Sequence, residues 1–129
     1  MVGQGRFVEV TADSENLLLM TDRALLMRVL ANLLKNALEA EPRGSTVSIR
    51  SMRQGRRGVF EVHNPSAMPR SVQLQIFQRS FSTKGKERGL GTYSIRLLSE
   101  RYLGGSVSFT STAQDGTRFR VEYPLGVEP

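Results

Sequence analysis

The segment Leu26–Ala40 constrains the fold more than any other part of the chain. Its apolar residues recur every three or four positions, which is the spacing of one face of an α-helix. They are Leu26, Val29, Leu30, Leu33, Leu34 and Ala37. Thr21 or Asp22 can cap the start of this helix by accepting from its first free backbone N–H groups. Pro42 breaks the pattern, so we expect the helix to run to about Glu41 and to pack against a core.

Asn32 and Asn36 lie one turn apart on the same side of this helix. At about 100° per residue, both fall on one flank of the apolar face, neither in its centre nor opposite it. They can be ordinary polar residues at a helix rim. They can also face a binding site, because a buried amide needs partners for its hydrogen-bonding groups. The helix alone leaves both interpretations open.

Length and composition indicate a single globular domain. The chain has 129 residues, of which 39% are hydrophobic and 23% charged, so one core can form but not two. It has no cysteine, which excludes disulfides, thiolate metal sites and cysteine nucleophiles. It also has no run of 18 apolar residues and no signal-peptide pattern. We therefore expect a cytoplasmic domain without membrane contact, whether or not its parent protein is anchored in a membrane.

The charge of the chain favours an anionic partner. The 18 Lys and Arg residues exceed the 12 Asp and Glu residues and give a net charge of +6. A nucleotide, a nucleic acid or an acidic protein would suit this charge. The basic residues are scattered, and no basic run alternates with aromatic residues as in proteins that bind single strands. The charge by itself therefore indicates an anion without identifying it, and our expected partners do not include a nucleic acid.

The remaining apolar patterns predict short strands and two more helices. Alternation and turn residues predict strands over 7–10, 17–20, 46–53, 59–62, 106–110 and 117–123. The helices are expected over 71–78, with Val72, Ile76 and Phe77 buried, and over 93–102, with Ile95, Leu97, Leu98 and Tyr102 on the core. Residues 63–69 contain two prolines and should be irregular. The expected fold class is α/β: a two-layer α/β sandwich whose mixed, mostly antiparallel sheet carries helices on one face.

A glycine turn before the last helix could hold phosphate. Gly89-Leu90-Gly91-Thr92 lets the backbone approach a ligand closely, and a helix N-terminus offers free N–H groups and partial positive charge. Upstream, the segment 81–86 places hydroxyls and two lysines next to this turn, as a lid over a triphosphate would. Each segment taken alone is equally compatible with a common surface loop.

Four segments, in this order, resemble the sequence boxes of sensor histidine kinases. They are 32–40 for the N box, 76–84 for the F box, 89–95 for the G2 box, and 116–119 with 123–125 for the closing Gly-Thr-x-Phe strand. The resemblance covers a core of about Phe7–Leu125, nearly the whole chain, as one domain. It implies the Bergerat ATP-binding fold, which is shared with gyrase, the Hsp90 chaperones and MutL-type proteins.

The resemblance implies that the cofactors are ATP and Mg²⁺. Asn36 would ligate Mg²⁺, with Asn32 assisting one turn earlier, and amide oxygens suffice where the triphosphate supplies the charge. Asn32 and Lys84 would be the catalytic residues, and Lys84 and Arg88 would neutralise phosphate oxygens. The other implied nucleotide contacts are Glu39, Ala40, Asn64, Met68, Phe81, Ser82, Thr83, Gly89, Leu90, Gly91, Thr92 and Thr117. Of these, Gly89, Gly91 and Thr92 would cradle phosphates, and Thr117 would lie by the adenine between Ala40, Met68 and Phe81.

Two segments depart from the family pattern. The G1 box normally reads Asp-x-Gly-x-Gly, and its carboxylate accepts from the adenine amino group. The matching segment 63–69 has neither Asp nor Gly: a gapless match puts His63 in the Asp position, and a one-residue deletion puts Asn64 there. We prefer Asn64, whose carbonyl can still accept, with a loss of about 1–2 kcal/mol of adenine binding. The lid over 82–88 is also short, so nucleotide should exchange quickly.

The resemblance favours phosphoryl transfer over ATP hydrolysis. Hydrolysing relatives have a glutamate four residues before the metal-binding Asn, whereas this chain has Asn32, which cannot act as a general base. The expected acceptor is a histidine on a separate dimerisation domain, N-terminal to Phe7 in the parent kinase, with a response regulator downstream. The alternatives are a degenerate nucleotide-binding module that regulates a partner by contact and, on charge alone, a nucleic-acid-binding α/β domain.

Overall fold

The computed structural model describes residues 5–76 and 86–126, and of residues 86–91 only the backbone. In chain order the elements are β1 (Phe7–Val10), α1 (Arg23–Glu39), β2 (Thr46–Gln54), β3 (Arg57–Asn64), α2 (Arg70–Gln73), α3 (Lys86–Leu97), the π-helix η1 (Leu98–Tyr102), β4 (Ser106–Thr112) and β5 (Gly116–Pro124). The strands form one sheet in the order β1-β2-β3-β5-β4. β1 runs parallel to β2, and the other neighbours are antiparallel, which confirms the expected mixed sheet.

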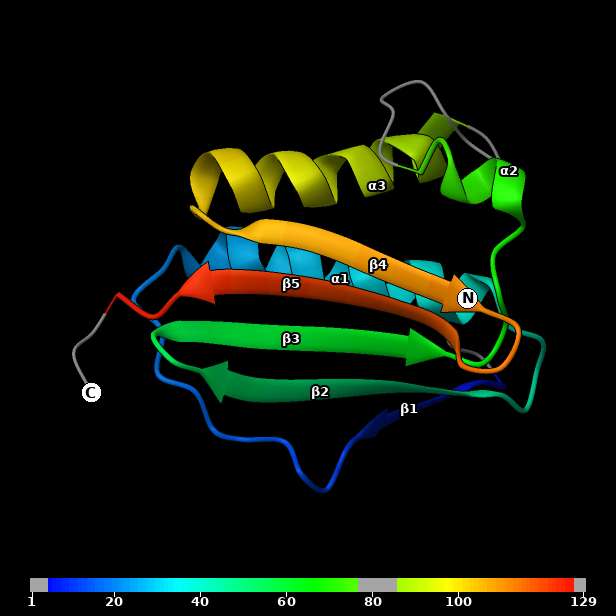
Figure 1. The fold of residues 1–129 in the computed structure, drawn as a ribbon, viewed down its shortest axis with the longest axis horizontal. Coiled ribbons are helices and arrows are strands. Elements are labelled where there is room, and N and C mark those ends of the chain that lie inside the picture. The colour runs from blue at the N-terminus through cyan, green and yellow to red at the C-terminus, as the bar shows by residue number, and fades with distance from the viewer. Residues whose placement is uncertain (1–4, 77–85, 127–129) are drawn as a thin grey trace.

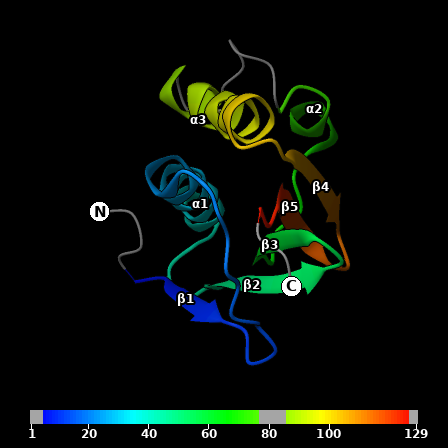
Figure 2. The same ribbon diagram turned by 90° about the vertical axis from the view of Figure 1, so that its left-hand side faces the viewer.

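The helices lie on one face of the sheet (Figure 1). Figure 2 shows α1 on the β1–β2 side of this layer and α3 on the β4 side. Within the described ranges no helix covers the opposite face, which carries charged side chains instead. There Arg120 pairs with Glu61 and with Glu122, each at 3.4 Å. The expected two-layer α/β sandwich is therefore confirmed.

The first long helix has the predicted position and a defined cap. Asp22, rather than Thr21, caps α1, since its Oδ1 accepts from the backbone N–H of Leu25 at 3.1 Å. The helix ends at Glu39, two residues before the predicted end, and Ala40 is its C-cap. Gly44 follows with φ of +89°, a conformation that suits glycine in the turn into β2.

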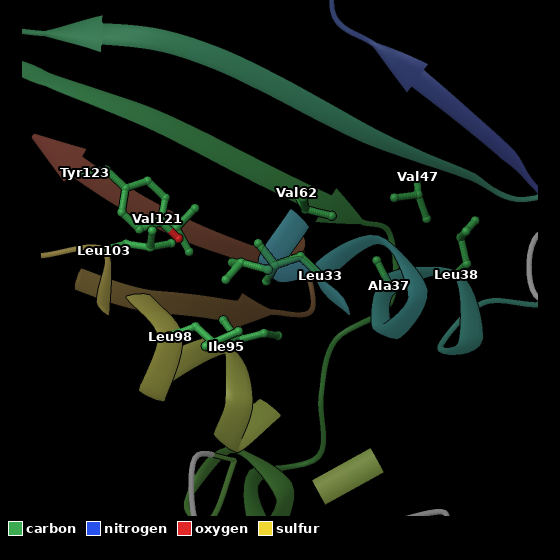
Figure 3. Packing of buried hydrophobic residues seen from close by; sticks show 11 residues of the cluster. Leu33, Ala37, Leu38, Val47, Val62, Ile95, Leu98, Leu103, Val121 and Tyr123 are labelled. Atoms are coloured by element: carbon green, nitrogen blue, oxygen red, sulfur yellow. The ribbon is translucent and has the colours of Figure 1, made fainter. Parts of the chain in front are cut away.

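The core lies between α1 and the sheet, and the α3–η1 pair closes it on the β4 side (Figure 3). Its buried members are Val29, Leu33, Ala37 and Leu38 from α1, Val47, Val62, Val121 and Tyr123 from the sheet, and Ile95, Leu98 and Leu103 from or next to the α3–η1 pair. Leu26, Leu30 and Leu34 pack against this cluster and are partly buried. The apolar face predicted for the long helix is therefore the face that it buries.

The second long helix begins earlier than predicted. α3 starts at Lys86 and passes through Gly89 and Gly91, so these glycines are inside the helix and not in a turn before it. A glycine inside a helix costs about 1 kcal/mol relative to alanine. Thr92 and Ile95, which are both buried, anchor the next turns against the core. Packing of those turns therefore outweighs the glycine penalty and extends the helix toward its N-terminus.

The end of this helical segment differs from the prediction at two residues, of which Leu97 is half-buried and does not belong to the core cluster. η1 is wound with an i to i+5 bond, in which the N–H of Leu103 donates to the carbonyl of Leu98 at 2.9 Å. The wider turn shifts the later side chains relative to a 3.6-residue repeat. Leu103 is therefore buried, whereas Tyr102, predicted to contact the core, is 65% exposed.

The predicted strand over 17–20 is not formed; in this segment the N–H of Met20 donates to the carbonyl of Leu125 at 2.8 Å. Beyond β1, the edge of β2 is already bonded by the turn that follows: Thr11 N–H donates to Ile49 O at 3.1 Å and Glu15 N–H to Ser51 O at 2.8 Å. Leu17 and Leu19 contact Gly58 with their side chains instead. The apolar run in this segment thus belongs to a half-buried chain without strand pairing.

Two further boundaries differ from the predictions. α2 spans only Arg70–Gln73, and Val72 and Ile76 are half-buried rather than buried, while Phe77 lies outside the described residues. The last two residues of β3, His63 and Asn64, belong to the sheet and not to the irregular segment. They are held there because β3 pairs with β5 up to the partners Asn64 and Thr117.

Candidate functional site

Those predicted site residues that lie in the described part of the chain gather at one end of the molecule. The C-terminal end of α1, the end of β3, α2, the start of α3 and the β4–β5 turn all lie there (Figure 1). Asn64 is the last residue of β3 and has the same parity as Val62, whose side chain is in the core. Asn64 therefore faces the helix side of the sheet. His63 faces the open side, where its Nε2 hydrogen-bonds the carbonyl oxygen of Asp115.

Asn64 belongs to a buried polar cluster with Glu41 and Ser66. Asn64 and Glu41 are only 5% and 4% exposed. Asn64 Nδ2 donates to Glu41 Oε2 at 2.8 Å. Ser66 donates to the same carboxylate twice, from its N–H to Oε2 at 3.0 Å and from its Oγ to Oε1 at 2.9 Å. The carboxylate thus joins the end of α1 to the loop that follows β3.

The same loop is tied to the last two strands. Thr117, which is buried, donates from Oγ1 to the carbonyl of Ser66 at 2.8 Å and lies 2.9 Å from Ser111 Oγ. The Ser111 hydroxyl also accepts from the N–H of Met68 at 2.7 Å. The Met68 carbonyl in turn accepts from Gln73 Nε2 of α2 at 2.9 Å. Asn64, Met68 and Thr117, three of the residues predicted to surround a base, therefore belong to one bonded unit.

Gly116 allows this loop to lie against the β4–β5 turn. Its φ is +81°, and a Cβ at this position would lie 2.3 Å from the carbonyl oxygen of Asn64 and 2.6 Å from that of Pro65. Any other residue would meet both a strained backbone and a clash. The Gly-Thr-x-Phe segment thus requires its glycine for steric reasons that do not depend on ligand binding.

The α1 residues of the predicted site line one flank of the helix. Asn32, Asn36 and Glu39 are half-buried, and Ala40 is exposed at the C-cap. Asn32 and Asn36 are one turn apart, as the spacing predicted. Among the residues with described side chains, no group of three His, Cys, Asp or Glu could hold a metal ion. A hard cation at this flank would therefore depend on amide oxygens and on oxygens supplied by a ligand.

Several predicted residues are not placed by the structure. Phe81, Ser82, Thr83 and Lys84 lie outside the described residues. Arg88, Gly89, Leu90 and Gly91 lie in the first two turns of α3, with the backbone alone described. The predicted glycine turn is therefore wrong, because in a regular helix the N–H groups of Gly91 and Thr92 bond within the helix. Thr92 itself is buried.

Three residues of this bonded unit were not predicted from the sequence: Glu41, Ser66 and Ser111. A signal for Glu41 was present: it lies just beyond the C-terminus of α1, where the helix dipole disfavours negative charge. An acidic residue in that place indicates that another group compensates the charge. The serines carry no comparable signal, because their roles depend on contacts between strands and loops far apart in sequence.

The family and the structural relatives agree with this architecture. The family model of histidine kinase-, DNA gyrase B-, and HSP90-like ATPases matches residues 21–127. Sporulation kinase C of Bacillus subtilis is 34% identical over 106 residues, which cover 81% of this chain and 24% of that kinase. The chain therefore spans about a quarter of that relative.

Solved structures give the same result at the level of the fold. The nucleotide-free catalytic domain of histidine kinase ThkA superposes with a TM-score of 0.77 and 30% identity, over 93% of this chain and 78% of that one. Histidine kinase ThkA in complex with the response regulator protein TrrA has a TM-score of 0.74 and 27% identity, over 93% of this chain and 34% of that one. None of the described helices is both long and apolar enough to cross a membrane. The chain belongs to the family of histidine kinase-, DNA gyrase B- and HSP90-like ATPases and has the fold of a histidine kinase catalytic domain.

Proposed function

We propose that this domain binds ATP with Mg²⁺ and supplies the γ-phosphate for autophosphorylation of a histidine on a separate dimerisation domain of its parent kinase. The observation that carries the proposal is the buried Asn64 amide at the end of β3, on the helix side of the sheet. Family membership supports ATP as the nucleotide. A response regulator is the proposed downstream partner, which the solved complex of ThkA with the response regulator protein TrrA supports.

The residues around Asn64 fit an adenine. Both Nδ2 hydrogens of Asn64 are used, by Glu41 Oε2 at 2.8 Å and by the carbonyl of Ser66 at 3.3 Å. No donor from the described residues reaches Asn64 Oδ1, so this oxygen can accept from the 6-amino group of the base. Thr117 lies beside it on β5 as the cross-strand partner, and Met68 supplies an apolar side chain. Glu39, Ala40 and Phe81 complete the proposed base and ribose contacts.

Asn36 is the proposed Mg²⁺ ligand, with Asn32 assisting from the preceding turn. Mg²⁺ takes oxygen ligands and keeps phosphates and waters in its shell, so a neutral amide oxygen is a suitable protein ligand. Bound there, the ion would neutralise charge on the transferred phosphoryl group. Ser82, Thr83, Lys84 and Arg88 are the proposed phosphate contacts, with Lys84 as a catalytic cation.

The residue at the position of the hydrolytic base supports transfer over hydrolysis. Asn32 lies one turn before Asn36, and its amide cannot remove a proton from water at neutral pH. The attacking group must therefore be nucleophilic without a general base from this domain, as the imidazole of an acceptor histidine is. The domain by itself should bind ATP with little turnover.

The test is titration calorimetry of a non-hydrolysable ATP analogue with Mg²⁺. We expect micromolar to sub-millimolar binding by the wild-type chain and at least tenfold weaker binding by Asn36→Ala. The matched control is Asn16→Ala, the same change at an exposed residue before α1. Equal affinity of Asn36→Ala and wild type would refute Asn36 as the metal ligand. Absence of binding at millimolar nucleotide would instead favour a contact-based regulatory module.

A further inference from the structure

We infer that Glu41 sets the base selectivity of this domain, because it fixes which end of the Asn64 amide faces the ligand. The inference rests on the proposed function, in which Asn64 contacts the base. It adds that the site prefers a purine with a 6-amino group over one with a 6-oxo group, and that Glu41 is the positioning residue responsible.

An asparagine in this position is ambiguous by itself. Its amide has an acceptor end and a donor end, so a free Asn64 could accept from a 6-amino group or, after a half turn, donate to a 6-oxo group. A carboxylate has no such ambiguity, because it only accepts. Replacing the family's Asp by an asparagine therefore removes the negative charge. It also leaves open whether residue 64 accepts or donates the hydrogen bond to the base. Another group must fix the direction of this hydrogen bond if the site is to distinguish the two bases.

Glu41 fixes the direction of this hydrogen bond, since an ionised carboxylate accepts hydrogen bonds and donates none. The 2.8 Å contact between Glu41 Oε2 and Asn64 therefore requires Nδ2 on the Glu41 side. The carbonyl of Ser66, another pure acceptor, lies 3.3 Å from the same nitrogen. Two acceptors on one side of the amide leave Oδ1 on the other. A flipped amide would place its oxygen against both acceptors and lose both bonds.

Glu41 cannot easily turn away from Asn64. Its carboxylate is held by the N–H of Ser66 at 3.0 Å and the hydroxyl of Ser66 at 2.9 Å, and the side chain is buried. Ser66 is itself fixed through the Thr117 hydroxyl at 2.8 Å. A buried carboxylate that lost these donors would be left without compensation, which is costly. Its negative charge also polarises the Asn64 amide and increases the acceptor strength of Oδ1.

The test compares the dissociation constants of Mg-ATP and Mg-ITP, which differ at the 6-position, for wild type and Glu41→Gln. Glutamine can accept or donate, so residue 41 no longer forces Nδ2 of Asn64 toward it, and only the weaker preference set by the N–H and carbonyl of Ser66 opposes a flip. We expect the wild type to prefer ATP at least tenfold. In Glu41→Gln this ratio should fall to threefold or less, with tighter binding of ITP. The matched control is Glu9→Gln, the same change at an exposed residue of β1, and its ratio should equal that of wild type.

A purely structural role of Glu41 would weaken both nucleotides equally. An unchanged ATP-to-ITP ratio in Glu41→Gln would therefore overturn the inference while leaving the proposed function intact. A wild type that binds neither nucleotide would overturn both. Should Glu41→Gln not fold, NMR of the wild type decides. The side-chain NH₂ of Asn64 must then exchange slowly with solvent in the nucleotide-free protein, and rapid exchange overturns the inference.

Discussion

The hydroxyl of Tyr123 lies 2.7 Å from Oγ of Ser99, and both side chains are almost fully buried, at 1% and 0% exposure. The bond joins the last strand to η1 across the core. Burial raises the pKa of Tyr123 to about 12 from its ordinary 10.0, and the bond with Ser99 offsets only part of that shift. Tyr123, near the end of β5, is therefore a buried group that resists ionisation in the folded state.

The first prediction concerns stability at high pH. Below pH 10 the Tyr123 hydroxyl is protonated in both states, and its contribution is fully present. Between pH 10 and about 12 the unfolded chain releases this proton while the folded chain retains it, so the free energy of unfolding falls as pH rises. At about 1.4 kcal/mol per pKa unit, the expected loss is about 2–3 kcal/mol, measured by urea denaturation at pH 8 to 11.5.

Tyr123→Phe is the control for this prediction. It leaves the buried Ser99 hydroxyl without its partner, so it should cost about 1–3 kcal/mol at neutral pH. It should also remove the Tyr123 share of the decline above pH 10. Parallel stability curves for the two proteins over this pH range would contradict the assignment.

The second prediction concerns Gly116. Replacement by alanine combines a left-handed φ of +81° with a Cβ 2.3 Å from the carbonyl oxygen of Asn64. We expect Gly116→Ala to lower the free energy of unfolding by about 2 kcal/mol or more and to weaken ATP binding, because the loop after β3 must move. Gly44→Ala is the control: its φ is +89°, but its Cβ would meet nothing within 4 Å. Equal losses for both variants would show that backbone strain alone explains the effect.

The sequence was most informative where one pattern extends over many residues. The apolar face from Leu26 to Ala37 recurs over three turns, so the position of α1 and its buried face were predicted to within two residues. The positions of most strands along the chain followed from apolar patterns and turn residues in the same way. The sheet edge could not be predicted locally. Leu17–Met20 is a continuous apolar run that predicts a strand, yet the turn after β1 already occupies the edge of β2 beyond β1.

The errors around the site have other physical causes. A 3.6-residue repeat places Tyr102 on the core, and only the i to i+5 bond between Leu98 and Leu103 moves it to the surface. The start of α3 depends on how its later turns pack against the core. The low helix propensity of Gly89 and Gly91 gives no indication of that packing. Glu41 acquires its role from Asn64, 23 positions later in the chain. Such long-range partners do not leave a periodic signal.

The third prediction concerns restoring the family's carboxylate. Asn64→Asp would place a second carboxylate at the 2.8 Å contact with Glu41, where both side chains are buried. Two buried carboxylates this close cannot both ionise, so one folded-state pKa is raised above its unfolded value. The variant should therefore be less stable than wild type at pH 7, by about 3–5 kcal/mol, and should regain stability relative to wild type as the pH falls toward 5.

The double variant Glu41→Gln/Asn64→Asp separates charge repulsion from loss of shape. In it, the glutamine amide can donate to the new carboxylate, which reverses the bond of the wild type while keeping one charge and nearly the same volume. We expect urea denaturation at pH 7 to show recovery of most of the stability that Asn64→Asp loses. Since Glu41→Gln alone removes no clash, this recovery would be a coupling between the two sites, measured as a double-mutant cycle. Additive losses in the cycle would mean that Glu41 and Asn64 do not share a hydrogen bond in solution.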